Sequence, residues 1–306
     1  MTTSPLAAAQ ALARGALVIL PTETVYGLGA DAGDARAVAA IFEAKGRPRF
    51  NPLIAHVADL DAAQRIAVLD ERALSLARAF WPGPLTLVAP LRDPGAVCDL
   101  ARAGLDTLAV RVPNHPLALE TLRLFGKPVV APSANRSGRP SPTTYADAVE
   151  ETGFAAAEAL DGGPCAVGLE STVVAVLDGP PRLLRAGGIT RAQIEAIVGP
   201  LAAADGDAKR SPGRLALHYA PNAPVRLNAD GPLAGEAFLA FGPTPHATPF
   251  NLSPAGDPRE AAANLFAFLR AADRLAPAAI AVAPIPEEGL GEAINDRLRR
   301  AAGFVG

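Results

Sequence analysis

The sequence has 306 residues, half of them hydrophobic and 19% charged, which is typical of a folded protein with one large domain or two smaller ones. Its formal charge of −3 argues against a protein that coats nucleic acid or an anionic membrane. Cys98 and Cys165 are far apart, which argues against a disulfide scaffold or a structural zinc site. No apolar run approaches a membrane span and no signal pattern opens the chain, so we expect a cytoplasmic protein.

The first two thirds of the chain alternate irregularly between helical and strand patterns. Ser4 and Asp34 are expected N-caps of the first two helices. Helices are predicted over 4–14, 34–44, 59–68, 71–80, 116–125 and 190–198, with another beginning at Thr143 or Thr144. Strands are predicted over 16–20, 53–57, 85–91, 107–112, 128–131, 172–177 and 182–185. This mixture predicts an open α/β sheet without a regular βαβ repeat.

Residues 199–224 have the composition of a linker, with His218 and Tyr219 as its exceptional side chains. Beyond it we expect strands at 225–228, 237–241 and 278–283, a long amphipathic helix at 258–275 and a final helix at 292–302. This pattern predicts a small Rossmann-like α/β domain that lacks a dinucleotide-binding G-x-G-x-x-G motif. The predicted domains are therefore 1–198 and 225–306, joined by the segment 199–224.

The stretch PTETVYGLGA at 21–30 follows the first apolar strand, and Pro21 should turn the backbone out of the sheet. Thr22 and Glu23 then stand just beyond a strand end, where open α/β sheets bind ligands. Two glycines in the same stretch would allow a ligand to approach the backbone closely. The alternative interpretation is an ordinary turn from a strand into a helix.

The loop KGRPR at 45–49 places Lys45, Arg47 and Arg49 within five residues of a predicted helix end. These cations could simply interact with the helix dipole, but a proline-stiffened loop with a Lys/Arg fork also suits a polyphosphate. His56, on the strand that follows, is either a buried core histidine or part of the same site.

Arg111 lies inside the apolar run LAVRV at 108–112, where an unpaired guanidinium would be costly to bury. It therefore forms either a structural salt bridge to an acidic residue or a bidentate contact with a ligand carboxylate.

Two more stretches place small donors next to strands: APSANRSG at 131–138 and GLEST at 168–172. Ser133, Asn135, Ser141 and Ser171 could contact phosphate, sugar or carboxylate groups, unless these are ordinary polar loops. No Ser–His–Asp order, H-E-x-x-H or Walker loop is visible. An enzyme that works by positioning and electrostatics, as phosphoryl and nucleotidyl transferases do, fits best.

These stretches occur in the order and approximate spacing of the YrdC-like domain, which residues 5–198 resemble. Other matching stretches are WPGPLT at 81–86, RVPNH at 111–115 and SPT at 141–143. With SPG at 211–213, HYAP at 218–221 and the small C-terminal domain, the chain resembles the long form of the threonylcarbamoyl-AMP synthase family.

The resemblance implies that L-threonine, bicarbonate or CO2, and ATP give threonylcarbamoyl-AMP, pyrophosphate and water. The product would feed the threonylcarbamoyladenosine modification of tRNAs, through a downstream transferase complex that binds transiently if at all. A Mg²⁺ ion would accompany ATP, and no metal site of the protein's own is expected.

The resemblance also implies roles for individual residues. The threonine site would comprise Thr22, His56, Arg111, Ala131 and Ser171. The ATP site would comprise Lys45, Arg49, Thr107, Ser133, Asn135, Ser141, Arg185 and His218, and Lys45 and Arg47 would be catalytic. The segment 199–224 would fold over the active site.

The chain departs from the family pattern at Arg214–Leu217, where basic and aromatic residues are usual, and after Arg185, where Ala186 replaces the usual proline. Two other functions remain open on the same fold. One is a double-stranded RNA-binding or ribosome-maturation module, which the acidic balance disfavours. The other is a carbamoyl-phosphate-using enzyme, whose extra zinc-binding segments this chain lacks.

Overall fold

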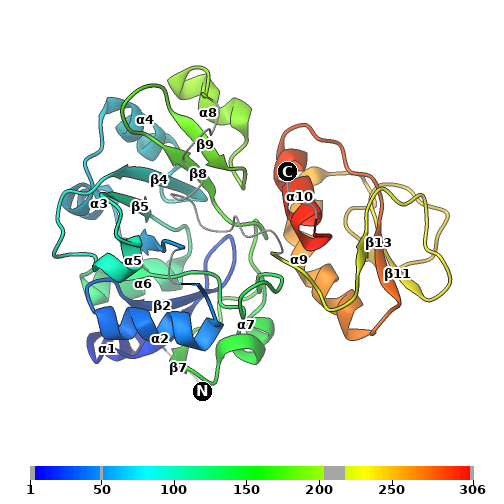
Figure 1. Ribbon diagram of the computed structural model, residues 1–306, viewed down its shortest axis with the longest axis horizontal. Helices are drawn as coiled ribbons and strands as arrows, with labels where there is room; N and C mark the ends of the chain where they lie inside the picture. Colours follow the sequence, from blue (N-terminus) through cyan, green and yellow to red (C-terminus); the bar gives the residue numbers. More distant parts are fainter. Residues whose placement is uncertain (1–3, 49–50, 203–217, 304–306) are drawn as a thin grey trace.

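A computed structural model describes residues 4–48, 51–202 and 218–303. Among these residues the strands form one nine-stranded and one four-stranded sheet, which divide the chain into two units. We call residues 4–202 the N-terminal unit and residues 218–303 the C-terminal unit (Figure 1). Within the described residues, no helix is both long and apolar enough to cross a membrane.

The nine-stranded sheet of the N-terminal unit is mixed, in the order β7-β1-β2-β6-β3-β5-β4-β8-β9. Strands β1 and β7, β3 and β5, and β4 and β8 pair in parallel, and the remaining neighbours pair antiparallel. The strands are β1 (Leu17–Leu20), β2 (Gly27–Asp31), β3 (Ile54–His56), β4 (Leu85–Pro90), β5 (Thr107–Arg111), β6 (Val129–Val130), β7 (Ala156–Ala159), β8 (Thr172–Ala175) and β9 (Arg182–Arg185).

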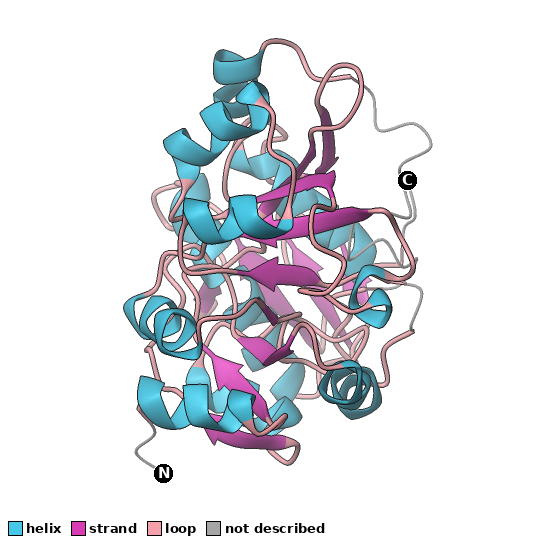
Figure 2. Cartoon of the chain, turned by 90° about the vertical axis from the view of Figure 1, so that its left-hand side faces the viewer, coloured by secondary structure: helices cyan, strands magenta, loops and turns pink. Residues whose placement is uncertain are grey.

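Helices cover both faces of this sheet (Figure 2). They are α1 (Pro5–Ala13), α2 (Ala35–Lys45), α3 (Leu60–Ile66), α4 (Glu71–Phe80), α5 (Asp99–Arg102), α6 (Pro116–Phe125), α7 (Tyr145–Thr152) and α8 (Arg191–Val198). The side chains of strand β1 alternate between the two faces of the sheet. Leu17 and Ile19 belong to the main core with α2, α3 and α4. Val18 and Leu20 point to the other face and pack with α1 and α6.

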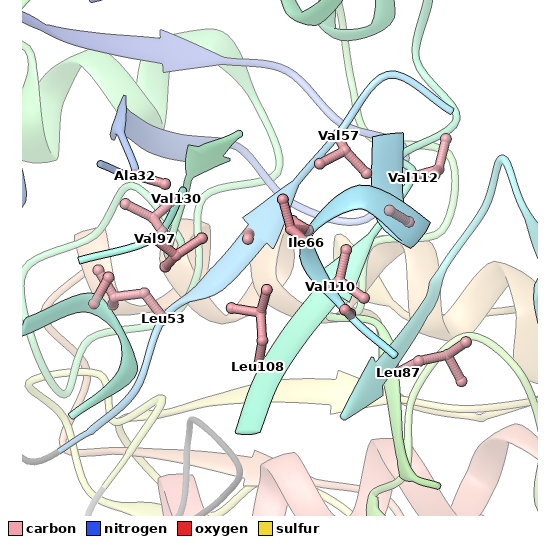
Figure 3. Close-up of a cluster of buried hydrophobic side chains, with 14 of the residues drawn as sticks. Ala32, Leu53, Val57, Ile66, Leu87, Val97, Leu108, Val110, Val112 and Val130 are labelled. Atoms are coloured by element: carbon pink, nitrogen blue, oxygen red, sulfur yellow. The ribbon is translucent and has the colours of Figure 1, made fainter. Parts of the chain in front are cut away.

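The alternation of side chains along β5 separates the core from a polar face. Leu108 and Val110 point into the main core, where they lie near Leu87 and Ile66 (Figure 3). Ala109 packs on the opposite side of the sheet, in a small cluster with Ile54. Arg111 follows Ala109 by two residues and therefore shares its face.

The expected helix starts are confirmed. The Ser4 hydroxyl accepts a hydrogen bond from Ala7 N at 3.2 Å, and Pro5 is the first helical residue. The Asp34 carboxylate accepts from Arg36 N at 2.8 Å at the start of α2. The expected α/β class, with a mixed open sheet and a second smaller α/β unit, is confirmed as well.

The prediction of a turn over residues 21–30 is only half right. Residues 21–26 form a loop, but Gly27–Asp31 is strand β2, which pairs antiparallel with β1 and β6. An added Cβ at Gly27 would lie 3.0 Å from the Ala131 Cβ, and one at Gly29 would lie 3.1 Å from a Val129 methyl. These glycines therefore permit close strand packing, which a sequence pattern does not distinguish from a turn.

The C-terminal unit has an all-parallel sheet in the order β10-β13-β11-β12. Its elements are β10 (Val225–Arg226), β11 (Glu236–Ala240), β12 (Phe250–Asn251), α9 (Pro258–Arg274), β13 (Ala279–Val282) and α10 (Leu290–Ala301). The short elements β7, β12 and α5 were not predicted, since two to four residues carry too little periodicity. Most of the predicted linker, residues 203–217, lies outside the described residues.

Helices α9 and α10 lie between the small sheet and the N-terminal unit (Figure 1). Arg270 of α9 forms a buried ion pair with Glu151, with 3.1 Å between Nη1 and Oε1. Gly168 allows the close approach of α9, because an added Cβ there would lie 2.5 Å from the Ala263 Cα. Gly168 also has a φ of +71°, which favours glycine for a second reason.

Candidate active site

Neighbouring strands β3 and β5 bring the side chains of His56 and Arg111 together on the polar face of the sheet. Their parallel register pairs His56 with Arg111 and Ile54 with Ala109. Residues paired in register share a face, so the His56 ring and the Arg111 guanidinium lie side by side. Both side chains are about 5% exposed or less.

Arg111 has a built-in carboxylate partner, Glu23, from the loop between β1 and β2. Arg111 Nη2 lies 2.7 Å from Glu23 Oε1, and Arg111 Nε donates to the Gly83 carbonyl at 3.2 Å. The other Glu23 oxygen accepts from Asn114 N at 2.9 Å. The structural salt bridge that the sequence left open therefore exists, while the guanidinium still reaches the adjacent cleft.

Ser171 stands immediately before β8 and is held from two sides. Its hydroxyl lies 2.7 Å from the Thr86 hydroxyl on the neighbouring strand β4. Arg185 of β9 donates to the Ser171 carbonyl at 2.9 and 3.1 Å and to the Ser171 hydroxyl at 3.1 Å. This arrangement fixes the serine and places a guanidinium beside it.

The loop after β6 is held by Lys45, the last residue of α2. The buried Lys45 ammonium donates to the carbonyl oxygens of Ser133 and Asn135, and Ser137 N donates to the Lys45 carbonyl at 2.7 Å. The Asn135 side chain bridges two further carbonyls, of Arg136 at 2.8 Å and of Arg139 at 2.9 Å. The loop is therefore rigidly attached to α2.

These elements surround a narrow cleft. The cleft is lined by Thr24, Val25, Arg47, Pro52, Leu53, Ile54, His56, Arg111, Ala131, Pro132, Ser133, Glu170, Ser171, Arg185, His218 and Tyr219.

The charge balance of the cleft favours anionic ligands. Arg47, Arg111 and Arg185 line it, against a single carboxylate, Glu170, among the described lining residues. Arg47 donates only weakly, to the Pro52 carbonyl at 3.4 Å, and its buried Nε has no partner within the described part of the chain. A buried donor without a partner is one that a ligand can satisfy.

Burial also changes the proton affinity of these groups. Desolvation lowers the pKa of Lys45 well below its usual value and that of Arg47 to about 10, and in each case a nearby guanidinium lowers it further. Desolvation also lowers the pKa values of His56 and His218 to about 3, with help from neighbouring cations. Both imidazoles are therefore neutral near pH 7.

The structure brings eight of the predicted site residues to the cleft: Arg47, His56, Arg111, Ala131, Ser133, Ser171, Arg185 and His218. Arg49 lies outside the described residues. Five others are buried and are not among the lining residues: Thr22, Lys45, Thr107, Asn135 and Ser141. Their predicted roles, like those of the eight, remain predictions.

Thr22 illustrates why a residue can match a motif without facing the cleft. Its hydroxyl donates to the Val25 carbonyl at 2.6 Å and accepts from Thr24 N and Val25 N, both at 3.2 Å. Thr22 therefore folds the loop whose next residues, Thr24 and Val25, line the cleft.

The other eight lining residues had no site role in the sequence-based prediction, and two of them, Glu170 and Tyr219, carry polar groups and contact Arg297 of the C-terminal unit. Glu170 accepts from the Ser141 hydroxyl at 2.6 Å and from Arg297 Nε at 3.0 Å. The place of Glu170 inside the GLEST stretch could have marked it as a candidate site residue. Its partner Arg297 is 127 residues away, however, and no local sequence pattern links the two.

Comparison with known proteins agrees with this architecture. Residues 10–187 match the Sua5–YciO–YrdC family model, described as "Telomere recombination", and residues 189–303 match the model "Threonylcarbamoyl-AMP synthase, C-terminal domain". A threonylcarbamoyl-AMP synthase of Pyrococcus abyssi is 40% identical over 97% of this chain and 93% of its own length. The chain belongs to the threonylcarbamoyl-AMP synthase family.

Other relatives support the same assignment. A threonylcarbamoyl-AMP synthase of Bacillus subtilis is 46% identical over 74% of this chain and 66% of its own length. A crystal structure of P. abyssi Sua5 complexed with L-threonine superposes with a TM-score of 0.89, at 38% identity, over 98% of this chain and 94% of that one. The family resemblance therefore extends through both units, including the C-terminal one.

Proposed function

We propose that this protein synthesises threonylcarbamoyl-AMP and pyrophosphate from L-threonine, bicarbonate or CO2, and ATP, for the threonylcarbamoyladenosine modification of tRNA. The observation that carries the proposal is the cleft, which three guanidiniums and two neutral histidines line together. Family membership supplies the reaction, and the guanidiniums suit the threonine carboxylate and the ATP phosphates.

The threonine side of the proposed site is built around Arg111, with His56, Ala131 and Ser171 beside it. The guanidinium would bind the threonine carboxylate while keeping Glu23 on its other side. Thr22 would contribute indirectly, by folding the loop that carries Thr24 into the lining.

The ATP side comprises Ser133, Arg185 and His218 in the lining, together with Arg47. Lys45, Asn135 and Ser141 would support this side from behind, because their polar atoms are bonded to the loop after β6 or to Glu170. Thr107 and Arg49 complete the proposed set.

We propose 1–198 as the catalytic domain, 225–306 as the second domain and 199–224 as the segment that covers the site.

In the proposed reaction the threonine amine first forms a carbamate with bicarbonate, with loss of water. A carbamate oxygen then attacks the α-phosphate of ATP, and pyrophosphate leaves. Arg47 would stabilise charge that develops on the phosphates, and Lys45 would hold the phosphate-binding loop and add positive potential. Mg²⁺ would enter bound to ATP and offset the charge of the departing pyrophosphate.

The deciding experiment measures pyrophosphate release from ATP, with threonine and bicarbonate omitted in turn. We expect release only when all three substrates are present, and transfer of the product to tRNA on addition of the downstream transferase complex. Release that does not need threonine would overturn the proposal. Salt-dependent binding of duplex RNA without ATP turnover would instead support the RNA-binding alternative.

A further inference from the structure

Arg297, on helix α10 of the C-terminal unit, is a fully buried charge at the boundary between the two units. Its side chain is 0% exposed. Its Nε donates to Glu170 Oε2 at 3.0 Å, and its Nη1 donates to Asp296 Oδ2 at 2.8 Å. Its guanidinium carbon lies 5.5 Å from the centre of the Tyr219 ring. Removal of either partner of a buried ion pair is costly, because it leaves the other charge buried and uncompensated.

The first partner, Glu170, is part of the cleft wall. Burial opposes ionisation of Glu170, but Arg297, Arg185 and the Ser141 hydroxyl together lower its pKa, so this carboxylate is ionised near pH 7. An ionised carboxylate only accepts hydrogen bonds, so the Ser141 hydroxyl must donate to Glu170 in the 2.6 Å bond between them. Arg297 therefore fixes Glu170 and, through Glu170, the orientation of Ser141.

The second partner, Tyr219, forms another part of the same wall. Its ring contacts both Arg297 and Phe266, whose ring centre lies 5.3 Å away. It also packs edge-on against His218 at 3.9 Å. The next residue, Ala220, donates its N–H to the Gly138 carbonyl at 2.8 Å, in the loop after β6. Arg297 thus supports a segment that lies against the proposed ATP-binding loop.

The proposed threonine side has separate supports. Ser171 is held by Thr86 and Arg185, and Arg111 is held by Glu23 and the Gly83 carbonyl. None of these hydrogen bonds or ion pairs is made by Arg297 itself, so we expect its loss to affect the nucleotide side more than the threonine side.

We propose that Arg297 is a positioning residue through which the C-terminal unit fixes the nucleotide side of the cleft, by binding Glu170 and supporting the Tyr219 ring. This inference rests on the proposed function, which places His218 in the lining of the ATP side and gives Ser141 a supporting role there. It gives the C-terminal unit a specific task in the reaction.

The test compares Arg297→Met, Arg297→Lys and Glu170→Gln with the unmodified protein. Calorimetry gives the Kd of ATP and of threonine separately, and pyrophosphate release gives KM and kcat. For Arg297→Met we expect the Kd and KM of ATP to rise at least tenfold and the Kd of threonine to change less than twofold. Arg297→Lys, which keeps the charge, should recover part of the ATP affinity.

The double variant Arg297→Met/Glu170→Gln tests whether the two residues act as a unit. Because Glu170→Gln removes the carboxylate that Arg297→Met leaves unpaired, the double variant should bind ATP no worse than Arg297→Met alone. Additive losses from the two single changes would overturn the connection through Glu170. If Arg297→Met does not fold, Arg297→Lys and Glu170→Gln still give the comparison of ATP with threonine.

Two matched controls separate positioning from general stability. Arg299→Met removes an arginine of the same helix whose ion pair, within the described part of the chain, is with the exposed Glu287 at 2.8 Å. Arg274→Met removes an arginine that joins the units through Asp147 and Glu150, away from the cleft lining. Both should bind ATP like the unmodified protein. Equal losses in Arg274→Met and Arg297→Met, or equal losses of ATP and threonine affinity in Arg297→Met, would overturn the proposal.

The readouts also separate this inference from the proposed function. An unmodified protein that binds ATP but releases no pyrophosphate with threonine would contradict the proposed reaction. The ATP affinities of the Arg297 variants would still decide whether Arg297 positions the nucleotide side.

Discussion

Glu23 and Arg111 form a buried ion pair in the wall of the cleft, with 2.7 Å between Oε1 and Nη2 and with less than a tenth of either side chain exposed. Glu23 comes from the loop after β1 and Arg111 from the end of β5, so the pair ties the opening loop to the centre of the sheet. It also means that a ligand carboxylate must share Arg111 with Glu23. The two residues should therefore affect threonine binding in opposite directions.

Arg111→Ala should raise the Kd of threonine at least tenfold and change the Kd of ATP much less, because it removes the proposed carboxylate partner and leaves Glu23 as an unpaired buried charge. Glu23→Gln should bind threonine at least as tightly as the unmodified protein, because Arg111 then has no competing carboxylate. Calorimetry with each ligand checks both variants. Equal loss of threonine and ATP affinity in Arg111→Ala would mean that Arg111 is structural.

Arg47→Met should reduce kcat by about a hundredfold, the usual effect of removing one donor that stabilises transition-state charge. Among the described residues Arg47 forms one long hydrogen bond of 3.4 Å and its Nε has no partner, so the temperature of unfolding should not fall. The measurement pairs steady-state kinetics with thermal unfolding. A variant that unfolds at a lower temperature while keeping its kcat would assign Arg47 to the structure instead.

The neutral buried histidines predict that stability falls in mild acid. An unfolded histidine binds a proton below about pH 6.5, whereas His56 and His218 stay neutral in the folded protein until about pH 3. The unfolded state therefore binds more protons, and stability is lost progressively as the pH falls from about 6.5 towards 3. At pH 5 each histidine should lower the free energy of unfolding by about 2 kcal/mol relative to its value near pH 7.

Urea unfolding at pH 7.5 and pH 5 measures this loss. His218→Asn should show a smaller loss between the two pH values than the unmodified protein, since one of the two titrating groups is gone. An equal loss in both proteins would show that His218 titrates normally in the folded state.

How far the sequence predicts this structure depends on whether a feature is local. Helix α2 was predictable because its N-cap, Asp34, and its apolar face lie within one short segment. Arg111 was predictable as a special residue because a charge interrupts an apolar strand. Strand β2 was not, because its pairing with β6 depends on residues a hundred positions away and its glycines resemble a turn.

The candidate site follows the same rule. Loops that end next to strands identified Ser133 and Ser171 as lining residues, and the structure places both in the cleft. The distinction between lining and supporting residues was not visible, because it depends on where each polar atom finds its partner. The side chains of Thr22 and Lys45 form hydrogen bonds to nearby backbone groups, and only the folded structure reveals this.

Gly187 lies directly behind the loop that carries Ser171, and we expect no side chain to be tolerated there. An added Cβ would lie 2.4 Å from the Glu170 carbonyl oxygen and from Thr172 N, so the backbone itself would have to move. Gly187→Ala should therefore lower the free energy of unfolding by about 1–3 kcal/mol and weaken threonine binding by displacing Ser171. Gly33→Ala is the matched control, because its nearest contact would be an ordinary 3.4 Å and its stability should change by less than about 0.5 kcal/mol. If Gly187→Ala kept both its stability and its threonine affinity, the loop before β8 would be able to adapt to the added methyl group. Threonine binding would then not require Ser171 to be held in place by Thr86 and Arg185.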